Sequence, residues 1–200
     1  MGHDNENNPS KTIPPPARAG SFSWPEIRTQ SQLQQTAETL QSGGKIYPAQ
    51  SNKIGEILKS LGVIDDKILD AVAKRHHTKK ANDKPTGELL VYMGIIEPEV
   101  LVRALCIQAG VPMVDAEAVN IPYDALKFVS NDNAREKRTI PVGVYKGTLY
   151  LAVADPLNFP DQQFFKFSTG LMISPVFASN DQIDTCLNTK WEADTERWAG

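Results

Sequence analysis

One segment of this chain occurs twice, and the repeat limits the possible folds more than any other feature. Residues 54–58 (IGEIL) match residues 86–90 (TGELL), and the same offset of 32 residues places Gly62 on Gly94. Apolar positions match along both copies as well. Repetition at such a period indicates a duplicated supersecondary unit, so we expect two copies of one small motif that pack against each other.

Each copy has the pattern of two helices joined by a tight turn. In the first copy, apolar residues recur from Ile54 at the spacing of one helix face. Gly62 suits the left-handed conformation that ends such a helix, and the acidic residues at 65–66 can cap the next helix. In the second copy Pro98 suits the first position of the second helix. The repeat therefore predicts a bundle of four short helices over residues 53–110.

Beyond residue 110 the pattern becomes that of strands and helices. Residues 139–144 and 148–154 are expected to form a hairpin that turns at a Lys-Gly pair, and residues 171–178 to form a third strand. Helices are expected over residues 161–167 and after Ser179, whose hydroxyl suits a helix N-cap. This order, β-β-α-β-α, predicts a small α/β sandwich.

The expected fold class is α+β: a small helical subdomain of two repeated helix-turn-helix units followed by the α/β sandwich subdomain. The expected parts are a disordered, Pro-rich arm over residues 1–50 with one short helix at 25–41, the helical repeat subdomain over 53–110, the α/β subdomain over 111–191 and a tail over 192–200. The arm has too few apolar side chains to offset the entropy of ordering. Pro25 suits the first position of its helix.

The composition argues against several classes of function. Lys and Arg total 21 against 24 Asp and Glu, so the net charge of −3 offers no general attraction to nucleic acid or to anionic membranes. The sequence has no apolar run of membrane-spanning length and no secretory signal. Cys106 and Cys186 lie in no motif, which argues against a disulfide framework. We expect a cytoplasmic protein with no nucleic-acid partner and no direct membrane insertion.

No motif for catalysis or for metal binding is visible. The sequence contains neither a P-loop of the form GxxxxGK[ST] nor a GxSxG nucleophile motif. His76 and His77 are adjacent, so on a helix their side chains would point about 100° apart and could not share one metal ion. We therefore expect no enzyme, no cofactor and no metal site.

The segment between the two copies is basic. Residues 74–84 contain five Lys or Arg residues and one Asp. Such a run is usually a solvated loop. A second interpretation is a loop that attracts a phosphate group lying across the repeat.

Gly55 and Gly87 occupy the same place near the start of a helix in each copy. The first backbone N–H groups of a helix have no partner within it, and the helix dipole is positive there. A glycine also lets a ligand approach the main chain closely. Two such helix starts, related by a pseudo-twofold axis, would suit a ligand with two phosphates and two bases. The alternative is that the glycines only permit close packing of helices, and spacing alone favours this alternative.

The repeat and the later segments together resemble a known family. The two helical copies, residues 149–158, Thr169-Gly170 and residues 175–178 resemble the tandem motif of MshEN domains. These domains form the N-terminal region of type II secretion and type IV pilus assembly ATPases. The resemblance covers about residues 53–191 and implies binding of cyclic di-GMP, a bacterial second messenger with twofold symmetry.

The family motif begins with Arg-Leu-Gly and ends in Leu-x-x-Gln, and the resemblance implies a set of ligand-binding positions. They are Lys53, Ile54, Gly55, Leu69, Ala73 and His76 in the first copy, and Thr86, Gly87, Leu101, Leu105 and Gln108 in the second. By resemblance the first residue meets a base or phosphate, the glycine N–H meets the phosphate, the apolar pair meets the guanine and the last residue meets a polar edge.

This chain departs from the family motif at several of these positions. The two leading arginines are replaced by Lys53 and Pro85, the second apolar residue of the first copy is Ala73, and His76 replaces a Gln. Lysine keeps the charge of arginine but lacks its planar fork. The loss of a leucine removes apolar contact of about 1–2 kcal/mol if the ligand buries it.

Two functions follow from the resemblance and its departures. The first is a non-catalytic regulatory module that binds cyclic di-GMP and signals to secretion, pilus or other envelope machinery. The alternative is a degenerate adaptor domain that docks on a secretion or pilus component without binding nucleotide.

Overall fold

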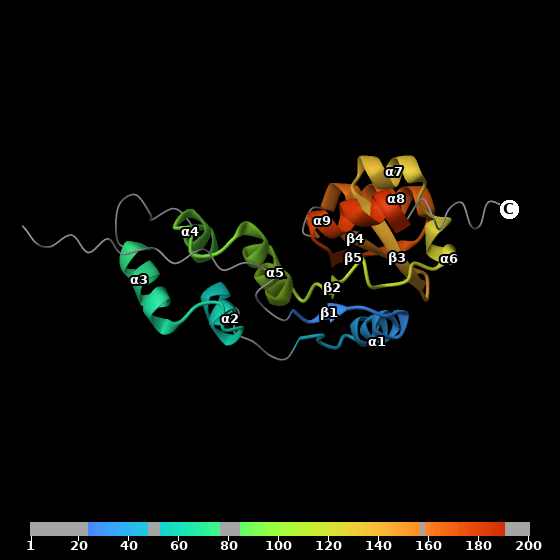
Figure 1. Cartoon of the computed structure of the whole chain (residues 1–200). Helices are drawn as coiled ribbons and strands as arrows, with labels where there is room; N and C mark the ends of the chain where they lie inside the picture. The colour runs from blue at the N-terminus through green and yellow to red at the C-terminus, as the bar shows by residue number, and fades with distance from the viewer. Residues whose placement is uncertain (1–23, 48–52, 77–84, 157–158, 191–200) are drawn as a thin grey trace, which may run out of the picture.

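The structure, a computed structural model, describes residues 24–47, 53–76, 85–156 and 159–190. A group of helices lies at one end of the molecule, and a five-stranded sheet with its own helices lies at the other (Figure 1). The observed fold class is therefore α+β, as expected. The expected limits of the subdomains stay a prediction. In the described part of the chain, no helix is both long enough and apolar enough to span a membrane.

The helical part consists of the four helices that the repeat predicts. They are α2 (Ile54–Ser60), α3 (Asp66–His76), α4 (Thr86–Tyr92) and α5 (Pro98–Ala109). Corresponding residues of the two copies are buried in one core, among them Leu58 with Leu90 and Ile64 with Ile96. The two copies thus share a single core, and one copy alone would leave its apolar face exposed.

The turn between the two helices of each copy has the same geometry. Gly62 has a φ of +72° and Gly94 a φ of +66°, the left-handed conformation that only glycine adopts without strain. The amide of the next residue donates to a carbonyl five residues back in both copies: Val63 to Leu58 at 2.9 Å and Ile95 to Leu90 at 3.0 Å. Both helices therefore end in a glycine C-cap, as the sequence predicts.

The sheet has the strand order β1-β2-β5-β4-β3. Strands β3 (Thr139–Tyr145) and β4 (Thr148–Val153) form the expected antiparallel hairpin, and β5 (Met172–Phe177) lies parallel to β4. Two short strands, β1 (Glu26–Ile27) and β2 (Met113–Val114), extend the sheet in parallel beyond β5. The sheet is therefore mixed and larger than the three strands expected.

Four helices pack with the sheet and contribute to its core. They are α6 (Tyr123–Leu126), α7 (Asn131–Glu136), α8 (Phe159–Thr169) and α9 (Asn180–Thr185), and α9 continues into a π-helical turn over Cys186–Lys190. The Ser179 hydroxyl caps α9, accepting from the Gln182 amide at 3.3 Å. Side chains from the sheet and these helices form a second core, distinct from the core of the helical repeat.

The N-terminal segment differs from the expected helix at 25–41. Residues 26–27 form β1, and helix α1 (Gln30–Gln41) begins only after Thr29. The Thr29 hydroxyl accepts from the Gln32 amide at 3.2 Å, and the Gln32 side chain accepts from the Thr29 amide at 3.1 Å. This capping box fixes the start of the helix more strongly than Pro25 does. Residues 1–23 of the expected arm and the expected tail over 192–200 lie outside the described residues.

Helix α1 packs against the sheet and is not part of a free arm. Its Leu33 and Ala37 are buried in the core of the sheet part. Gly143 on β3 makes this possible, because a Cβ atom there would lie 2.6 Å from Leu33 Cδ2. The side-chain Nε2 of Gln30 donates to the Val142 carbonyl at 2.8 Å and so satisfies an acceptor on the edge strand β3.

Candidate ligand-binding site

Gly55 lies under a leucine of the following helix. It is the second residue of α2, and a Cβ atom at this position would lie 2.7 Å from Leu69 Cδ2. Leu69 belongs to α3 and is half-buried, so one side of it covers the glycine and part of it remains accessible. The absence of a side chain at Gly55 therefore lets Leu69 of α3 lie against the start of α2.

The second copy repeats this arrangement. Gly87 is the second residue of α4, and a Cβ atom there would overlap Leu101 Cδ1 and lie 3.4 Å from its Cδ2. Leu101, on α5, is half-buried like Leu69. In each copy, the glycine comes from the first helix and the leucine from the second, with the same separation in sequence.

The starts of α2 and α4 lie next to each other. A Cβ atom on Gly55 would be 3.9 Å from Cγ2 of Thr86, the first residue of α4. Helices α2 and α4 also contact each other directly. The structure therefore brings Gly55, Leu69 and Thr86 together, and the first-turn N–H groups of both helices belong to one region.

The other expected ligand positions spread outward from this region. Lys53 is the exposed N-cap residue of α2, and Ile54 is the half-buried first residue of that helix. Ala73 is exposed on α3. His76 is the last residue of α3, and its side chain lies outside the described part of the chain.

On α5, the expected positions share one side of the helix. Leu105 is half-buried, and Gln108 is exposed near the C-terminal end. Gln108 lies seven residues beyond Leu101, which is about 10 Å along the helix axis. A ligand that touches both Gly87 and Gln108 must therefore span two turns of α5.

Neither cysteine has the environment of a nucleophile. Burial raises the pKa of the Cys106 thiol to about 12, so the thiol is neutral at physiological pH. The Cys186 thiol is buried and donates to the Ala116 carbonyl at 3.0 Å. Over the described residues, no group of three or more His, Cys, Asp or Glu side chains could hold a metal ion.

Sequence reasoning missed one conspicuous residue of α5. Arg103 is 5% exposed and lies among buried apolar residues of the same helix, including Val100, Ala104 and Ile107. The sequence contained one signal for it: Arg103 falls on the apolar face of the predicted helix, which indicates a buried charge. A charged residue on such a face needs partners, and these come from segments that the sequence does not connect.

The chain as a whole is an α+β module with a duplicated helical unit beside a mixed sheet. The family model of the MshEN domain matches residues 109–189, which contain β2 to β5 and helices α6 to α9. This match confirms the resemblance to MshEN domains over the sheet part, and it begins only at Ala109, the last residue of α5 in the helical repeat.

Two relatives are type IV pilus assembly ATPases named PilB. The protein from Myxococcus xanthus is 29% identical over 133 residues, which is 66% of this chain and 23% of the relative. The protein from Thermus thermophilus is 24% identical over 125 residues, which is 62% of this chain and 14% of the relative. The chain therefore spans less than a quarter of the pilus ATPases that it matches.

Solved structures that match part of this chain include MshE with cdg and the N-terminal domain of XpsE. The MshE structure is 20% identical, with a TM-score of 0.49, over 68% of this chain and 96% of that chain. The XpsE domain is 21% identical, with a TM-score of 0.43, over 70% of this chain and 96% of that chain.

Proposed function

We propose that this chain is a non-catalytic regulatory module of the MshEN type that binds cyclic di-GMP on its helical repeat. In this proposal it acts in the cytoplasm and signals to secretion, pilus or other envelope machinery. The helical repeat subdomain, over residues 53–110, holds the ligand, and the α/β subdomain, over 111–191, follows it.

The observation that carries the proposal is the equivalence of the two glycine–leucine pairs. Gly55 with Leu69 and Gly87 with Leu101 form the same contact, and the start of α2 lies beside Thr86 at the start of α4. Two equivalent sets of first-turn N–H groups suit a ligand with two equivalent phosphates. The half-buried leucines offer apolar surface next to them, suited to the faces of two bases.

Titration of the purified full chain with cyclic di-GMP by calorimetry tests the proposal. We expect saturable binding by the wild type. The diagnostic variant is Gly87→Asp, which places a carboxylate beside the proposed phosphate position. Its matched control is Gly87→Ala, which adds the same Cβ atom against Leu101 without the charge.

The two variants separate packing from electrostatics. We expect Gly87→Asp to bind at least tenfold more weakly than Gly87→Ala, a difference of about 1.4 kcal/mol. Circular dichroism must show the same helix content in both. Absence of heat with the wild type at high micromolar ligand contradicts the proposal. Equal affinities of the two variants would place the site elsewhere.

The alternative function, a protein-docking adaptor without nucleotide, is favoured by one specific feature. Both leading arginines of the family motif are absent, and the position before α4 is held by Pro85, which has no N–H donor and no charge. Affinity for a folded secretion or pilus component, measured with a chain that gives no heat with cyclic di-GMP, would support the adaptor.

A further inference from the structure

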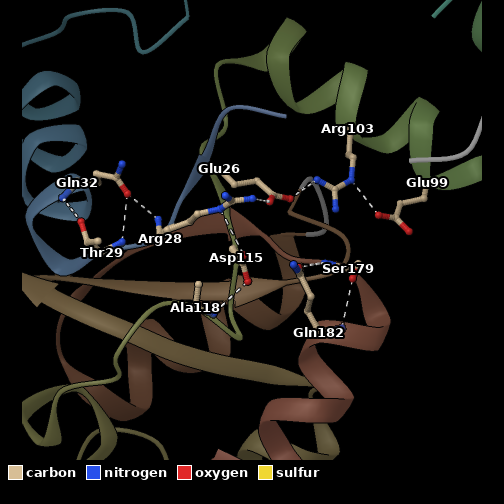
Figure 2. Close-up of polar contacts among 10 residues, drawn as sticks. All are labelled: Glu26, Arg28, Thr29, Gln32, Glu99, Arg103, Asp115, Ala118, Ser179 and Gln182. Atoms are coloured by element: carbon tan, nitrogen blue, oxygen red, sulfur yellow. Dashed lines mark hydrogen bonds and ion pairs between the residues drawn. The ribbon is translucent and has the colours of Figure 1, made fainter. Parts of the chain in front are cut away.

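Arg103 is a buried charge held by two carboxylates. Its side chain is 6% exposed and pairs with Glu26 on β1, whose side chain is 10% exposed. On its other side, Nε donates to Glu99, one turn earlier on α5, at 2.8 Å (Figure 2). A buried guanidinium is costly unless it is paired, so these partners select one position for the arginine.

Two aromatic rings complete the surroundings of Arg103. Its Cζ atom lies 5.4 Å from the ring centroid of Trp24 and 5.2 Å from that of Phe177. Trp24 precedes β1, and Phe177 ends β5. A guanidinium at such distances is attracted to the ring faces. One side chain of the helical part therefore contacts two separate segments of the sheet part.

A second ion pair extends this connection into the sheet. Arg28 lies 3.7 Å from the Glu26 carboxylate and 3.4 Å from that of Asp115, which follows β2 (Figure 2). Glu26 thus lies between two arginines, Arg103 from the helical repeat and Arg28, which directly follows β1. These ion pairs form a continuous series that connects α5 to β1 and to Asp115 after β2.

On α5, Arg103 and the expected ligand residues point in opposite directions. At about 100° per residue around the helix axis, Leu101, Leu105 and Gln108 lie within about 60° of one another. Arg103 lies about 160° from Leu101, on the opposite side of the helix. Exposure agrees with this geometry, because Arg103 is buried and the other three are half-buried or exposed. Fixing Arg103 therefore fixes the direction of the opposite face.

The first copy of the repeat lacks this anchor. The position that corresponds to Arg103 is Ala71, which is exposed on α3. Figure 1 shows α5 as the helix next to the sheet part, with α3 far from it. The two copies are therefore equivalent in fold but differ in attachment.

We propose that Arg103 is a positioning residue: by pairing with Glu26 of β1 it fixes the rotation of α5 and so orients Leu101, Leu105 and Gln108 toward the ligand. The pair with Glu99, within α5, holds the guanidinium in the position from which it reaches Glu26. The part of this inference that concerns the ligand rests on the proposed function. The anchoring of α5 to the sheet part does not, and it is tested separately.

The first measurement needs no ligand. Spin labels on Tyr92→Cys at the end of α4 and Phe167→Cys on α8 report the distance between the two parts. Both positions are well exposed, at 74% and 85%, whereas the native Cys106 and Cys186 are buried. Double electron–electron resonance is recorded on the full chain, with and without Arg103→Met.

The matched control is Arg138→Met, which breaks another arginine–carboxylate pair, with Asp184 at 2.9 Å, inside the sheet part. We expect Arg103→Met to broaden the distance distribution and Arg138→Met to leave it unchanged. An unchanged distribution in Arg103→Met overturns the anchor. If Arg103→Met does not fold, Glu26→Gln replaces it, because the amide keeps the shape of the carboxylate and removes its charge.

The second measurement is calorimetry with cyclic di-GMP. We expect Arg103→Met to weaken binding at least tenfold, Arg103→Lys to recover part of the loss, and Arg138→Met to bind like the wild type. A broadened distance distribution with unchanged affinity overturns the positioning role. A wild type that does not bind overturns the proposed function, and the spin-label distances still decide on the anchor.

Discussion

Replacing Gly87 with alanine is expected to strain the helical repeat. The new Cβ atom would overlap Cδ1 of Leu101 and lie 3.5 Å from its Cγ. Leu101 is only half-buried, so its side chain can turn away, but it then loses its packing over the start of α4. The substitution therefore tests whether the glycine is needed for close packing.

Two opposing effects set the expected magnitude. Inserting a methyl group into a packed contact costs about 1–3 kcal/mol. Alanine in place of glycine inside a helix returns about 1 kcal/mol. We therefore expect Gly87→Ala to lower the free energy of unfolding by about 0–2 kcal/mol. Gly55→Ala should cost less, because its Cβ would lie 2.7 Å from Leu69 Cδ2 and needs a smaller shift.

A double-mutant cycle with Leu101→Ala gives the decisive result. Leu101→Ala removes the atoms that the new Cβ meets, so the effects of the two substitutions should not add. We expect the double variant to be more stable than the sum predicts by about 1 kcal/mol. Urea unfolding, followed by circular dichroism, measures each free energy, and an unchanged m-value shows that the unfolded state is comparable.

Gly62→Ala is the control for a different cause of strain. Gly62 has a φ of +72°, and no other part of the described chain lies within 4 Å of where its Cβ would be. Alanine there should cost about 1–2 kcal/mol through the backbone alone. Leu101→Ala should not relieve that cost. If Gly87→Ala and Leu101→Ala are strictly additive, the packing argument is wrong.

Three further predictions follow from single residues. Arg103→Met should lower the free energy of unfolding by about 3–5 kcal/mol, because it removes the buried partner of Glu26 and leaves only the exposed Arg28 beside this carboxylate. Lys127→Met at an exposed pair should cost less than about 1 kcal/mol. Urea unfolding measures both. Ser179→Ala should cost about 1 kcal/mol through loss of the α9 cap, seen as a lower urea midpoint. Because burial raises the pKa of Cys106 from 9.0 to about 12, its contribution to stability is complete below pH 9 and declines as the pH rises toward 12. Stability measured between pH 8.5 and 10 should therefore fall less steeply in Cys106→Ala than in the wild type.

The helical part was predictable because its signals are local. The glycines at 62 and 94 end their helices in the way the sequence indicates, with positive φ at both. The apolar spacing of each copy gives the buried face directly, as with Leu58 and Leu90. Repetition strengthens such signals, because every position is seen twice.

The edge of the sheet was not predictable by the same means. Strands β1 and β2 have two residues each, too few to show alternation of apolar and polar side chains. Their formation depends on pairing between residues 26–27 and 113–114, which are far apart in sequence. The true start of α1 at Gln30 had a readable signal in Thr29 and Gln32, a capping box that Pro25 obscured.

At the candidate site, too, the sequence predicted the local features but not the contacts between helices. The place of Gly55 and Gly87 near the start of a helix was open to two interpretations, close packing of helices or approach of a ligand. The structure shows that Leu69 and Leu101 cover Gly55 and Gly87, which agrees with the first interpretation. It leaves the second as a proposal, because the covering leucines are themselves expected ligand residues.

The asymmetry between the two copies bears on how a symmetric ligand would bind. Beyond the glycine of each copy, the departures from the family motif fall in the first copy, at Ala73 and His76, whereas the second copy keeps Leu101, Leu105 and Gln108. The second copy is also the one whose helix is tied to the sheet part through Arg103. If the proposed function holds, one half of the ligand therefore meets an anchored helix that keeps the leucines and the glutamine of the motif, and the other half meets a helix that has lost two of these side chains. The anchored helix is α5, which contacts β1 through Arg103 and is followed in the chain by β2. Most of the binding free energy would therefore come from contacts with the helix that is joined to the sheet.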